Sequence, residues 1–303
     1  MKFLIVGAGA VGGYFGARLL EKGEDVTFLV RAKRKEQLDR DGLVIESVNG
    51  NTIVQPKTVM AGEDETFDVI LIGTKAYHLD QAIEEVKPFT NEKSVIIPML
   101  NGMAHLRQLQ NAFSKEQVIG GLCFIESTVT TEGVIKQTSK AHIFMFGELN
   151  GEYTERIQKI EKAFLDTNAM VKVSNSILED MWHKYLFITT MSGVTTLFHK
   201  PVGPIRELPE GEEVVKGLIK EIADVMRAEE APIASHVEEI QFKRFQEQGY
   251  KMKSSMQRDM EKGAAVEVDH LQGYLLKKAR LHQIETPILK SIYVNLKLYE
   301  QAL

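Results

Sequence analysis

The feature that most constrains the fold is a glycine pattern close to the start of the sequence. Gly7, Gly9 and Gly12 form a G-x-G-x-x-G. The apolar segment before them, Phe3–Val6, is short enough for a buried strand, and Tyr14–Leu20 after them carries apolar residues at helical spacing. Glycines also punctuate ordinary loops, so the motif alone is weak, but a strand before it and a helix after it make it specific.

The segment that follows completes a known supersecondary unit. Gly23 stands where a helix C-cap is expected, and Val26–Val30 has the composition of a second strand. Strand, glycine turn, helix and strand predict a dinucleotide-binding unit, in which the first glycine permits the tight turn, the second lets backbone approach a pyrophosphate and the third lets helix pack on strand. The helix N-terminus attracts the phosphates. We expect the cofactor to bind the turn residues Gly7, Ala8, Gly9, Ala10, Val11 and Gly12.

The end of the second predicted strand indicates which cofactor is preferred. A site for NAD usually has Asp or Glu there, whereas this sequence has Arg31, followed by Lys33 and Arg34. A guanidinium can hold a 2′-phosphate through two hydrogen bonds, and a carboxylate would repel it. The alternative is a solvated basic turn. At this position the sequence favours NADP.

Length and composition restrict the class of protein. A chain of 303 residues suggests about two domains. The net charge is −5 and no basic block stands out, which argues against nucleic acid as the main partner. The single cysteine, Cys123, cannot form an internal disulfide, so we expect a reducing compartment and a small buried side chain. Glycines and charges interrupt every apolar stretch, so neither a signal peptide nor a membrane helix is expected, and we predict a cytoplasmic protein.

Two further apolar runs add candidate site residues. Phe67–Gly73 and Ser94–Leu100 are predicted to be buried parallel strands. Lys75 and Asn101 follow them directly. Because ligands of open α/β sheets bind outside the carboxyl ends of the strands, these two residues should lie beside the glycine turn and Arg31.

The remaining elements of the first half are less regular. The alternating stretch Leu43–Val59 predicts a hairpin or strand pair around Asn49-Gly50. Further strands are expected at Val118–Ile125, Gly133–Gln137, His142–Phe146 and Ala169–Val173, and helices at Lys33–Arg40, Leu79–Val86, Ala104–Phe113 and Ile157–Thr167.

From Ser176 onward almost no strand signal remains. Helical patterns cover Leu178–Lys200, Glu212–Ala231, Ala234–Gly249, Ser255–Gly263, Val268–His282 and Ile288–Leu303. We therefore predict an α/β Rossmann-type N-terminal domain, residues 1–174, followed by an all-α C-terminal domain, residues 175–303.

These motifs in this order resemble the ketopantoate reductase (2-dehydropantoate 2-reductase) family along essentially the whole chain. In the first half the matching segments are GAGAVGGYFGARL at 7–19, Arg31, TKA at 74–76 and NGM at 101–103. In the second half they are WHKYLF at 182–187, Pro201, Gly203, SSM-x-x-D-x-x-x-G at 254–263, EVDHLQG at 267–273 and TP at 286–287. Other Rossmann-plus-helical dehydrogenases share only the first part.

The resemblance implies NADPH-dependent reduction of a 2-keto acid, with ketopantoate as the leading substrate. It identifies Lys184 as the catalytic lysine and Glu267 as the catalytic glutamate, which also lies at the cofactor. Lys75 and Asn101 would contact both cofactor and substrate, and Ser255 would bind the substrate carboxylate. The residues expected to face the substrate are Lys75, Asn101, Lys184, Ile188, Ser192 and Ser255.

Several positions depart from the family pattern. Ile188, Ser192, Val202 and Met252 stand where the family often has asparagine. Polar groups that hydrogen-bond a substrate discriminate strongly between substrates, so their replacement should change substrate preference more than it disables the reaction.

The chemistry of the proposed residues has simpler alternatives. Lys184 could donate a proton and stabilise charge on the carbonyl oxygen, or it could lie on a solvated helix face. Glu267 could hold the product hydroxyl and orient Lys184, or it could be a carboxylate favoured at a helix start. Ser254 and Ser255 could be an N-cap. His183, His199 and His270 have no partner at metal-ligand spacing, so we expect no metal and no histidine acid.

Two hypotheses follow for the whole chain. One is an NADPH-dependent reductase of ketopantoate or of another 2-keto acid; the other is a non-catalytic NADP-binding protein of the same fold. Keeping both Lys184 and Glu267 favours the enzyme. The apolar helices of the second half could also form a homodimer interface.

Overall fold

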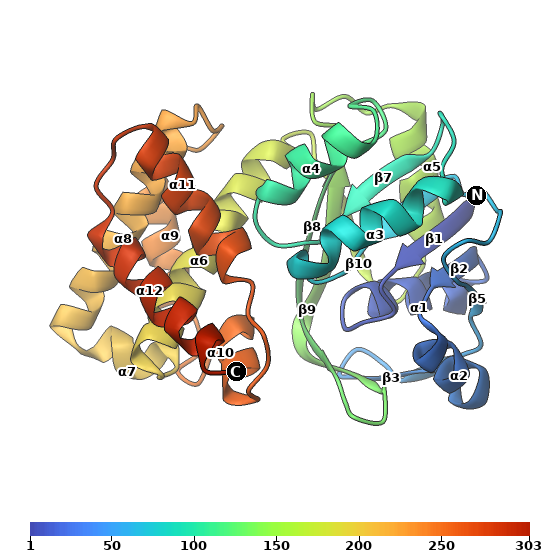
Figure 1. Ribbon diagram of the computed structural model, residues 1–303, viewed down its shortest axis with the longest axis horizontal. Helices are drawn as coiled ribbons and strands as arrows, with labels where there is room; N and C mark the ends of the chain where they lie inside the picture. The colour runs from blue at the N-terminus through green and yellow to red at the C-terminus, as the bar shows by residue number, and fades with distance from the viewer. The chain divides into compact units, whose positions relative to one another are not determined.

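The chain forms two compact units. The computed structural model describes residues 1–303, and Met1–Leu100 with His105–Ile177 make the first unit, here called the N-terminal unit (Figure 1). Asn101–Ala104 and Leu178–Leu303 make the second, here called the helical unit. The short segment Asn101–Ala104 therefore belongs with residues that follow it in the sequence by more than seventy positions.

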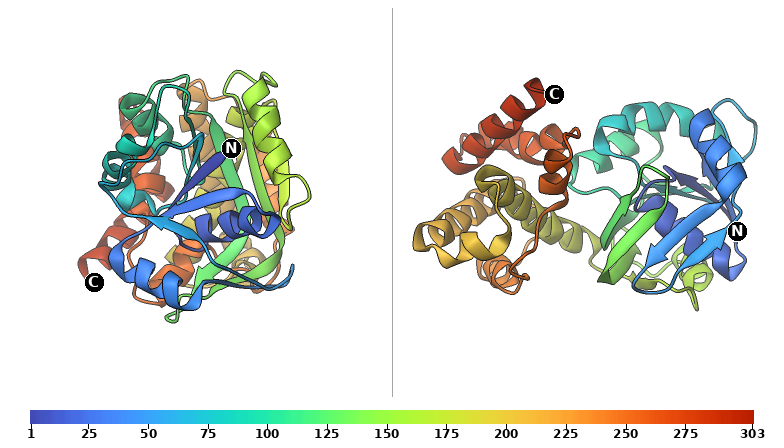
Figure 2. Two further views of the ribbon diagram at one scale, coloured as in Figure 1. Left: turned by 90° about the vertical axis from the view of Figure 1, so that its right-hand side faces the viewer. Right: turned by 90° about the horizontal axis from the view of Figure 1, so that it is seen from below.

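The N-terminal unit is built on a parallel sheet with the strand order β5-β2-β1-β6-β7 (Figures 1 and 2). Its strands are β1 Lys2–Val6, β2 Asp25–Leu29, β5 Lys57–Val59, β6 Val69–Ile72 and β7 Val95–Pro98. Val6 pairs with Leu29 on one side and with Ile72 on the other, so the central strands end at one level. β6 and β7 are buried on both faces, as their continuous apolar sequences predict.

The first helix explains the unusual sequence after the glycine turn. α1 spans Gly12–Lys22 and contacts β1 and β2 as well as β3, β4 and β9 of a second sheet. Gly16 allows this close packing, since a Cβ there would lie 2.6 Å from the ring of Phe28. The helix ends at Gly23, whose φ of +96° is the left-handed C-cap that the sequence predicts.

The other helices of this unit agree with the sequence analysis. They are α2 Ala32–Asp41, α3 Leu79–Val86 and α5 Glu155–Phe164, with α4 Ala104–Ala112 beginning in the loop that joins the helical unit. Short 3₁₀ turns, η1 Ala76–His78 and η2 Lys87–Phe89, flank α3.

The second sheet differs from the prediction in two ways. Its order is β10-β9-β3-β4, with β8 paired to β9; the strands are β3 Leu43–Ser47, β4 Thr52–Val54, β8 Gly120–Val129, β9 Ile135–Gly147 and β10 Met170–Val173. The predicted hairpin at Asn49-Gly50 joins β3 to β4, but the end of that stretch is a separate strand, β5, in the main sheet. The two strands predicted between Gly133 and Phe146 form one strand, β9.

A bulge explains why β9 looked like two strands. Residues 138–141, between the two predicted strands, are the extra residues of a bulge in β9, because Ile125 of β8 pairs with His142 and Ser127 pairs with Gln137. There the amide of Glu126 donates to the hydroxyl of Ser139, at 2.9 Å, in place of a ladder carbonyl. A side chain of the bulge therefore satisfies the backbone amide that faces it on β8, and β9 continues as one strand.

The helical unit contains no strand. Its helices are α6 Ile177–Phe198, α7 Val202–Glu207, α8 Pro209–Ala228, α9 Val237–Gln246, α10 Ser255–Glu261, α11 Tyr274–Leu281 and α12 Pro287–Gln301. A π-helical segment, η3 Asp269–Gly273, runs directly into α11. The first half of the chain therefore carries the parallel sheet and the second half is all-α, as predicted.

One helix was missed, and one expectation about Cys123 is confirmed. α7 contains Gly203 and Pro204, which resemble a loop, but backbone bonds from Val202 and Gly203 to the carbonyls of Met252 and Tyr250 hold this turn. Cys123 forms no disulfide and is buried in the core of the N-terminal unit.

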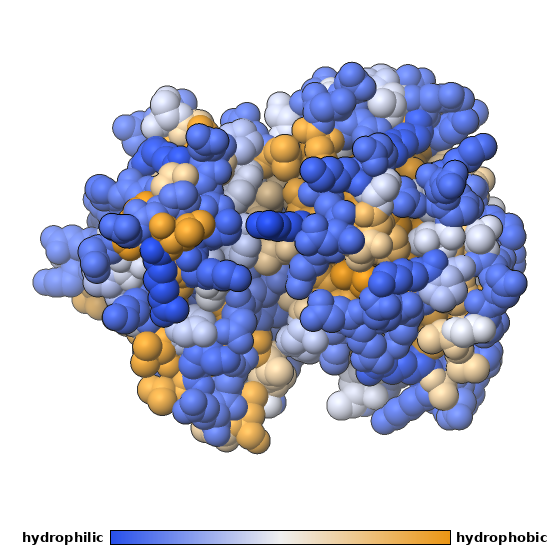
Figure 3. Space-filling view, turned by 45° about the horizontal axis from the view of Figure 1, so that its top comes forward, coloured by the Kyte–Doolittle hydropathy of each residue, from blue (hydrophilic) through white to orange (hydrophobic).

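The surface gives two further observations. The face drawn in Figure 3 is mainly hydrophilic, with apolar atoms in scattered groups. No helix combines the length and apolar character needed to cross a membrane.

Candidate active site

The glycine turn has the geometry expected of a dinucleotide site. Gly7 has a φ of +97°, and a Cβ there would lie 3.1 Å from the carbonyl oxygen of Gly73. A Cβ on Gly12 would lie 2.4 Å from the carbonyl oxygen of Gly7, so the third glycine is what allows α1 to approach the turn. A Cβ on Gly9 would meet nothing within 4 Å. The second glycine therefore borders open space, as a residue beside a bound ligand should.

The start of α1 is electrostatically suited to an anion. No side chain caps its N-terminus and its first turn has no acidic residue. The amide groups there and the positive end of the helix dipole would favour phosphate. The Thr74 hydroxyl is buried without a hydrogen-bond partner, and the Thr74 methyl would contact a Cβ on Gly7 at 3.3 Å. An unpaired buried hydroxyl beside this turn is a further donor for a ligand.

Side chains from a distant strand and from a neighbouring helix hold the turn in place. The Ser127 hydroxyl of β8 donates to the carbonyl of Ala10 at 2.9 Å. Arg34 of α2 donates to the carbonyl of Ala8 at 3.0 Å and to that of Gly133 at 3.1 Å. These bonds fix the peptide planes between the glycines, and the residues that make them were not identified from the sequence.

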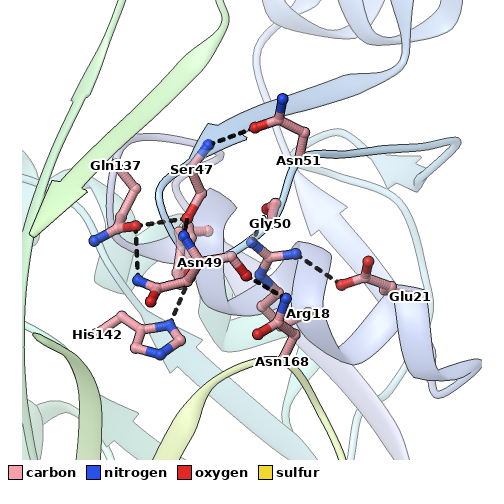
Figure 4. Close-up of polar contacts among 10 residues, drawn as sticks. Arg18, Glu21, Ser47, Asn49, Gly50, Asn51, Gln137, His142 and Asn168 are labelled. Atoms are coloured by element: carbon pink, nitrogen blue, oxygen red, sulfur yellow. Dashed lines mark hydrogen bonds and ion pairs between the residues drawn. The ribbon is translucent and has the colours of Figure 1, made fainter. Parts of the chain in front are cut away.

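A buried arginine fixes α1 itself. Arg18 is fully buried and donates to the carbonyl of Gly50 at 2.6 Å and to Glu21 at 2.8 Å (Figure 4). Its guanidinium lies 4.9 Å from the centroid of the Tyr14 ring, and the Tyr14 hydroxyl is hydrogen-bonded to Nδ1 of His142 at 2.7 Å. The helix that presents the glycine turn is thus tied to the β3–β4 turn and to β9 by charged and polar groups.

Arg31 and Arg34 have different environments although both are basic residues of one turn. Arg31 is exposed immediately after β2, at the N-cap of α2, and donates to Gln81 of α3 at 2.8 Å. Burial lowers the pKa of the Arg34 guanidinium, which is turned toward backbone carbonyls. Arg31 is therefore the more accessible of the two guanidinium groups, whereas Arg34 supports the turn.

The two other predicted strand-end residues lie in different units. Lys75 follows β6 and is the N-cap residue of η1, half-buried in the N-terminal unit. Asn101 follows β7 but belongs to the helical unit, where its carbonyl oxygen is 2.8 Å from Nε2 of His270.

The catalytic candidate Lys184 lies on α6 and is buried, with 5% of its surface exposed. The alternative of a solvated helix face is therefore wrong. Ile188 and Ser192 follow at steps of four residues, which places them on the same side of the helix. Ile188 is half-buried, whereas Ser192 is only 3% exposed and accepts a hydrogen bond from Gln272 at 3.0 Å. The Ser192 hydroxyl is therefore engaged within the helical unit.

Glu267 immediately precedes the helix that contains η3 and α11. Its backbone carbonyl accepts from the amide of Leu271 at 3.0 Å. Burial lowers the pKa of His270, and the carboxylate of Glu267 opposes that shift. The helix-start position is confirmed, and it leaves the half-exposed carboxylate beside the residue that holds Asn101.

The two serines at the start of α10 have separate roles. Ser254 is the N-cap: its hydroxyl accepts from the amide of Gln257 at 3.0 Å and is hydrogen-bonded to Thr195 of α6 at 2.7 Å. Ser255 is the first residue of the helix and is exposed. Of the two, Ser255 is the one that can reach a ligand.

The other departures from the family pattern lie near this helix. Val202 is fully buried, and its amide donates to the carbonyl of Met252 at 3.0 Å. No group of three His, Cys, Asp or Glu residues is placed to hold a metal ion.

Comparisons with known protein families match both units. The model of "Ketopantoate reductase PanE/ApbA" matches residues 3–151, and that of "Ketopantoate reductase PanE/ApbA C terminal" matches residues 176–300. An uncharacterized oxidoreductase of Bacillus subtilis, YkpB, is 53% identical over 99% of this chain and 99% of its own.

Solved structures share the fold along the full length. The 2-dehydropantoate 2-reductase of Geobacter metallireducens is 26% identical with a TM-score of 0.89, and covers 100% of both chains. D-mandelate dehydrogenase, crystallised with NADH and anilino(oxo)acetate, has a TM-score of 0.89 at 19% identity, with 100% of this chain and 99% of its own covered. The dimeric ketopantoate reductase of Staphylococcus aureus has a TM-score of 0.83 at 20% identity, with the same coverage.

Proposed function

This chain belongs to the ketopantoate reductase family of NAD(P)-dependent oxidoreductases, and from that premise we propose that it reduces 2-dehydropantoate (ketopantoate) to pantoate with NADPH. The observation that carries the proposal is the buried lysine, Lys184, on α6. A lysine removed from water at a position matching the family's catalytic lysine is suited to proton donation, because proton transfer requires a positioned and partly desolvated acid.

The N-terminal unit supports the cofactor assignment. The glycine turn offers backbone amides and open space at Gly9, and Arg31 offers an exposed guanidinium at the end of β2 where NAD-preferring proteins place a carboxylate. NADPH, when bound, would supply the hydride. Arg31 would hold its 2′-phosphate, the turn from Gly7 to Gly12 its pyrophosphate, and Lys75 and Asn101 would contact it and the substrate.

The helical unit would supply the proton and the grip on the acid. As negative charge develops on the substrate oxygen, the ammonium group of Lys184 would stabilise it and donate the proton. Glu267 would hold the resulting hydroxyl and lie at the cofactor, and the exposed Ser255 would bind the substrate carboxylate. In this scheme residues 1–174 form the NADP-binding domain and residues 175–303 the substrate domain.

A different 2-keto acid is the second candidate substrate. Ile188 is a half-buried apolar residue on the Lys184 side of α6, and the Ser192 hydroxyl is engaged by Gln272. This side of the helix offers less hydrogen bonding to a hydroxylated substrate than asparagines would, which favours a more apolar keto acid.

Turnover measurements separate these proposals. The absorbance of NADPH should fall on addition of ketopantoate or of one of a panel of straight, branched and aromatic 2-keto acids. Preference for an apolar member would identify the second candidate. No oxidation with any of them, together with tight binding of NADPH, would instead indicate a non-catalytic NADP-binding protein.

The assembly state is also a proposal. Val294 and Leu298 lie one turn apart on α12 and are 48% and 61% exposed, so this helix offers apolar side chains to a second copy. Light scattering of the purified protein would give the mass of a homodimer or of a monomer. The cytoplasmic location stays a prediction.

A further inference from the structure

We propose that His270 is a positioning residue that holds the loop after β7 and the catalytic candidate Glu267 in one arrangement; the inference rests on the proposed function of that site. In the proposed reaction His270 itself takes no part. Four features of the helical unit carry the proposal.

The first feature is the hydrogen bond between His270 and the loop. Nε2 of His270 lies 2.8 Å from the backbone oxygen of Asn101. A carbonyl oxygen can only accept, so Nε2 carries the hydrogen and the neutral ring has its lone pair on Nδ1. The bond reaches across 169 positions of sequence and fixes the residue from which the Asn101 side chain projects.

The second feature is the fit of the loop backbone to the ring. Gly102 has a φ of +86°, and a Cβ there would lie 3.1 Å from Cδ2 and Nε2 of His270 and from Cδ2 of Leu271. The backbone conformation therefore favours glycine, and a Cβ would make a tight contact with the ring. The loop backbone therefore packs directly against the imidazole ring.

The third feature is the proximity of Glu267. Burial holds the pKa of His270 below its usual value, although the carboxylate of Glu267 and the bond to Asn101 act in the opposite direction. The lowered pKa favours the neutral ring, in which Nε2 still donates to the carbonyl of Asn101. Asn101 and Glu267, predicted separately as site residues, thus share one neighbour.

The fourth feature anchors this arrangement to α6. His270 lies in the π-helical segment η3, whose wider turns leave carbonyl groups without the usual helical partner. The carbonyl of Leu271 accepts a hydrogen bond from the hydroxyl of Tyr185, a fully buried residue next to Lys184. His270 is therefore held in a turn whose position is set from the helix that carries the proposed acid.

The test compares two substitutions at His270. In His270→Gln the amide nitrogen can still donate to the Asn101 carbonyl, whereas in His270→Leu no donor remains. We expect His270→Leu to lower kcat/KM about ten-fold, the typical effect of one lost hydrogen bond to a buried group, and His270→Gln to stay within about three-fold of wild type. His282→Leu, at a partly exposed histidine paired with Glu229 in the same unit, is the control and should leave turnover unchanged.

A readout independent of turnover examines the loop itself. Hydrogen exchange of the peptide covering residues 99–104 should be faster in His270→Leu than in wild type and near wild type in His270→Gln. Gly102→Ala, which leaves the histidine intact but forces the loop off the ring, should reproduce the His270→Leu pattern and serves where that variant is unstable.

The outcomes are distinct. Equal losses in His270→Gln and His270→Leu, or unchanged loop exchange in His270→Leu and Gly102→Ala, would overturn the proposal. Failure of the wild-type protein to oxidise NADPH with any keto acid would overturn the proposed function instead, while the exchange data would still decide whether His270 holds the loop.

Discussion

In the proposed site the two units would offer a ligand different kinds of chemical group. In the N-terminal unit the groups are peptide amides around Gly7 and Gly9, held by side chains such as Arg34 and Ser127 that stand behind them. In the helical unit the groups are side chains, of which Lys184 is buried and Glu267 half-exposed. A site built from backbone amides loses affinity for its ligand when a substitution adds side-chain atoms. A site built from side chains loses its function when a substitution removes those atoms. We therefore expect added atoms to be harmful in the N-terminal unit and removed atoms to be harmful in the helical unit.

The largest effect is expected from removing the buried lysine. Lys184→Ala should lower kcat by about 10²–10⁴-fold, the range for loss of a general acid, while NADPH binding changes little. Turnover followed by NADPH absorbance measures the first and fluorescence titration the second. Lys216→Ala, at an exposed lysine of α8, is the matched control. A Lys184→Ala protein that kept a tenth of its turnover would not be using this residue as its acid.

The glycine turn should fail when atoms are added. In Gly9→Ala the new methyl meets no protein atom, so the melting temperature should be unchanged while the Kd for NADPH rises up to about a hundred-fold, since the methyl enters the ligand's space. In Gly12→Ala the methyl meets the Gly7 carbonyl, so stability should fall by about 1–3 kcal/mol as well. Thermal unfolding with and without NADPH measures both. Unchanged affinity in Gly9→Ala would place the cofactor elsewhere.

The two arginines beside the turn should separate cofactor choice from support. Arg31→Ala should weaken NADPH binding about ten-fold, the lower range for a charged hydrogen bond because the residue is exposed, and leave NADH binding unchanged. Arg34→Ala should weaken both cofactors alike, since it loosens the turn at Ala8. Titration with each cofactor gives the four constants. Equal losses of NADPH and NADH in Arg31→Ala would remove its assignment to the 2′-phosphate.

The smallest effects concern the pH dependence of stability. One carboxylate in each unit should contribute to it, and the two contributions should have opposite signs. Burial alone would raise the pKa of Glu148, but hydrogen bonds from Arg156 and Thr154 outweigh it and hold that pKa below 4.5. The unfolded chain then binds more protons, so the stability contributed by Glu148 is present above pH 4.5 and is lost as the pH falls further. Burial raises the pKa of Glu221 above 4.5, although its carboxylate accepts hydrogen bonds from backbone amides of α12. The stability contributed by Glu221 is therefore lost as the pH rises above 4.5.

Denaturant unfolding from pH 3 to 7 tests this pair on the range where carboxylates titrate. Glu148→Gln should flatten the loss of stability at acid pH, and Glu221→Gln should flatten a loss toward neutral pH. If stability depended on pH with the same slope in both variants and in wild type, the pKa of neither carboxylate would change on folding.

Local features of the chain were predicted more successfully than features that depend on distant residues. The glycine turn, β6 and the C-cap at Gly23 are local, since each follows from a few adjacent residues whose backbone or burial admits little choice. β9 was divided in the prediction because its polar middle, residues 138–141, bulges out of the ladder opposite Glu126 of another strand, β8. α7 was missed because its amides are satisfied by carbonyls about fifty residues later.

The site shows the same contrast. Strand ends and glycines pointed to Gly9 and Arg31 from position alone. The burial of Lys184, the hydrogen bond from Gln272 to Ser192 and the contact of His270 with Asn101 depend on residues that meet only after folding, and no spacing in the sequence predicts them.

The excursion of Asn101–Ala104 into the helical unit has a consequence for taking the molecule apart. A fragment of residues 178–303 would contain every α-helix from α7 to α12 yet lack the four residues that complete this unit. In such a fragment the imidazole of His270 would face water where it now meets a peptide carbonyl. The boundary that a linear cut would follow is thus not the boundary of the folded body, and a peptide spanning the β7–α4 junction should bind the fragment as its missing piece.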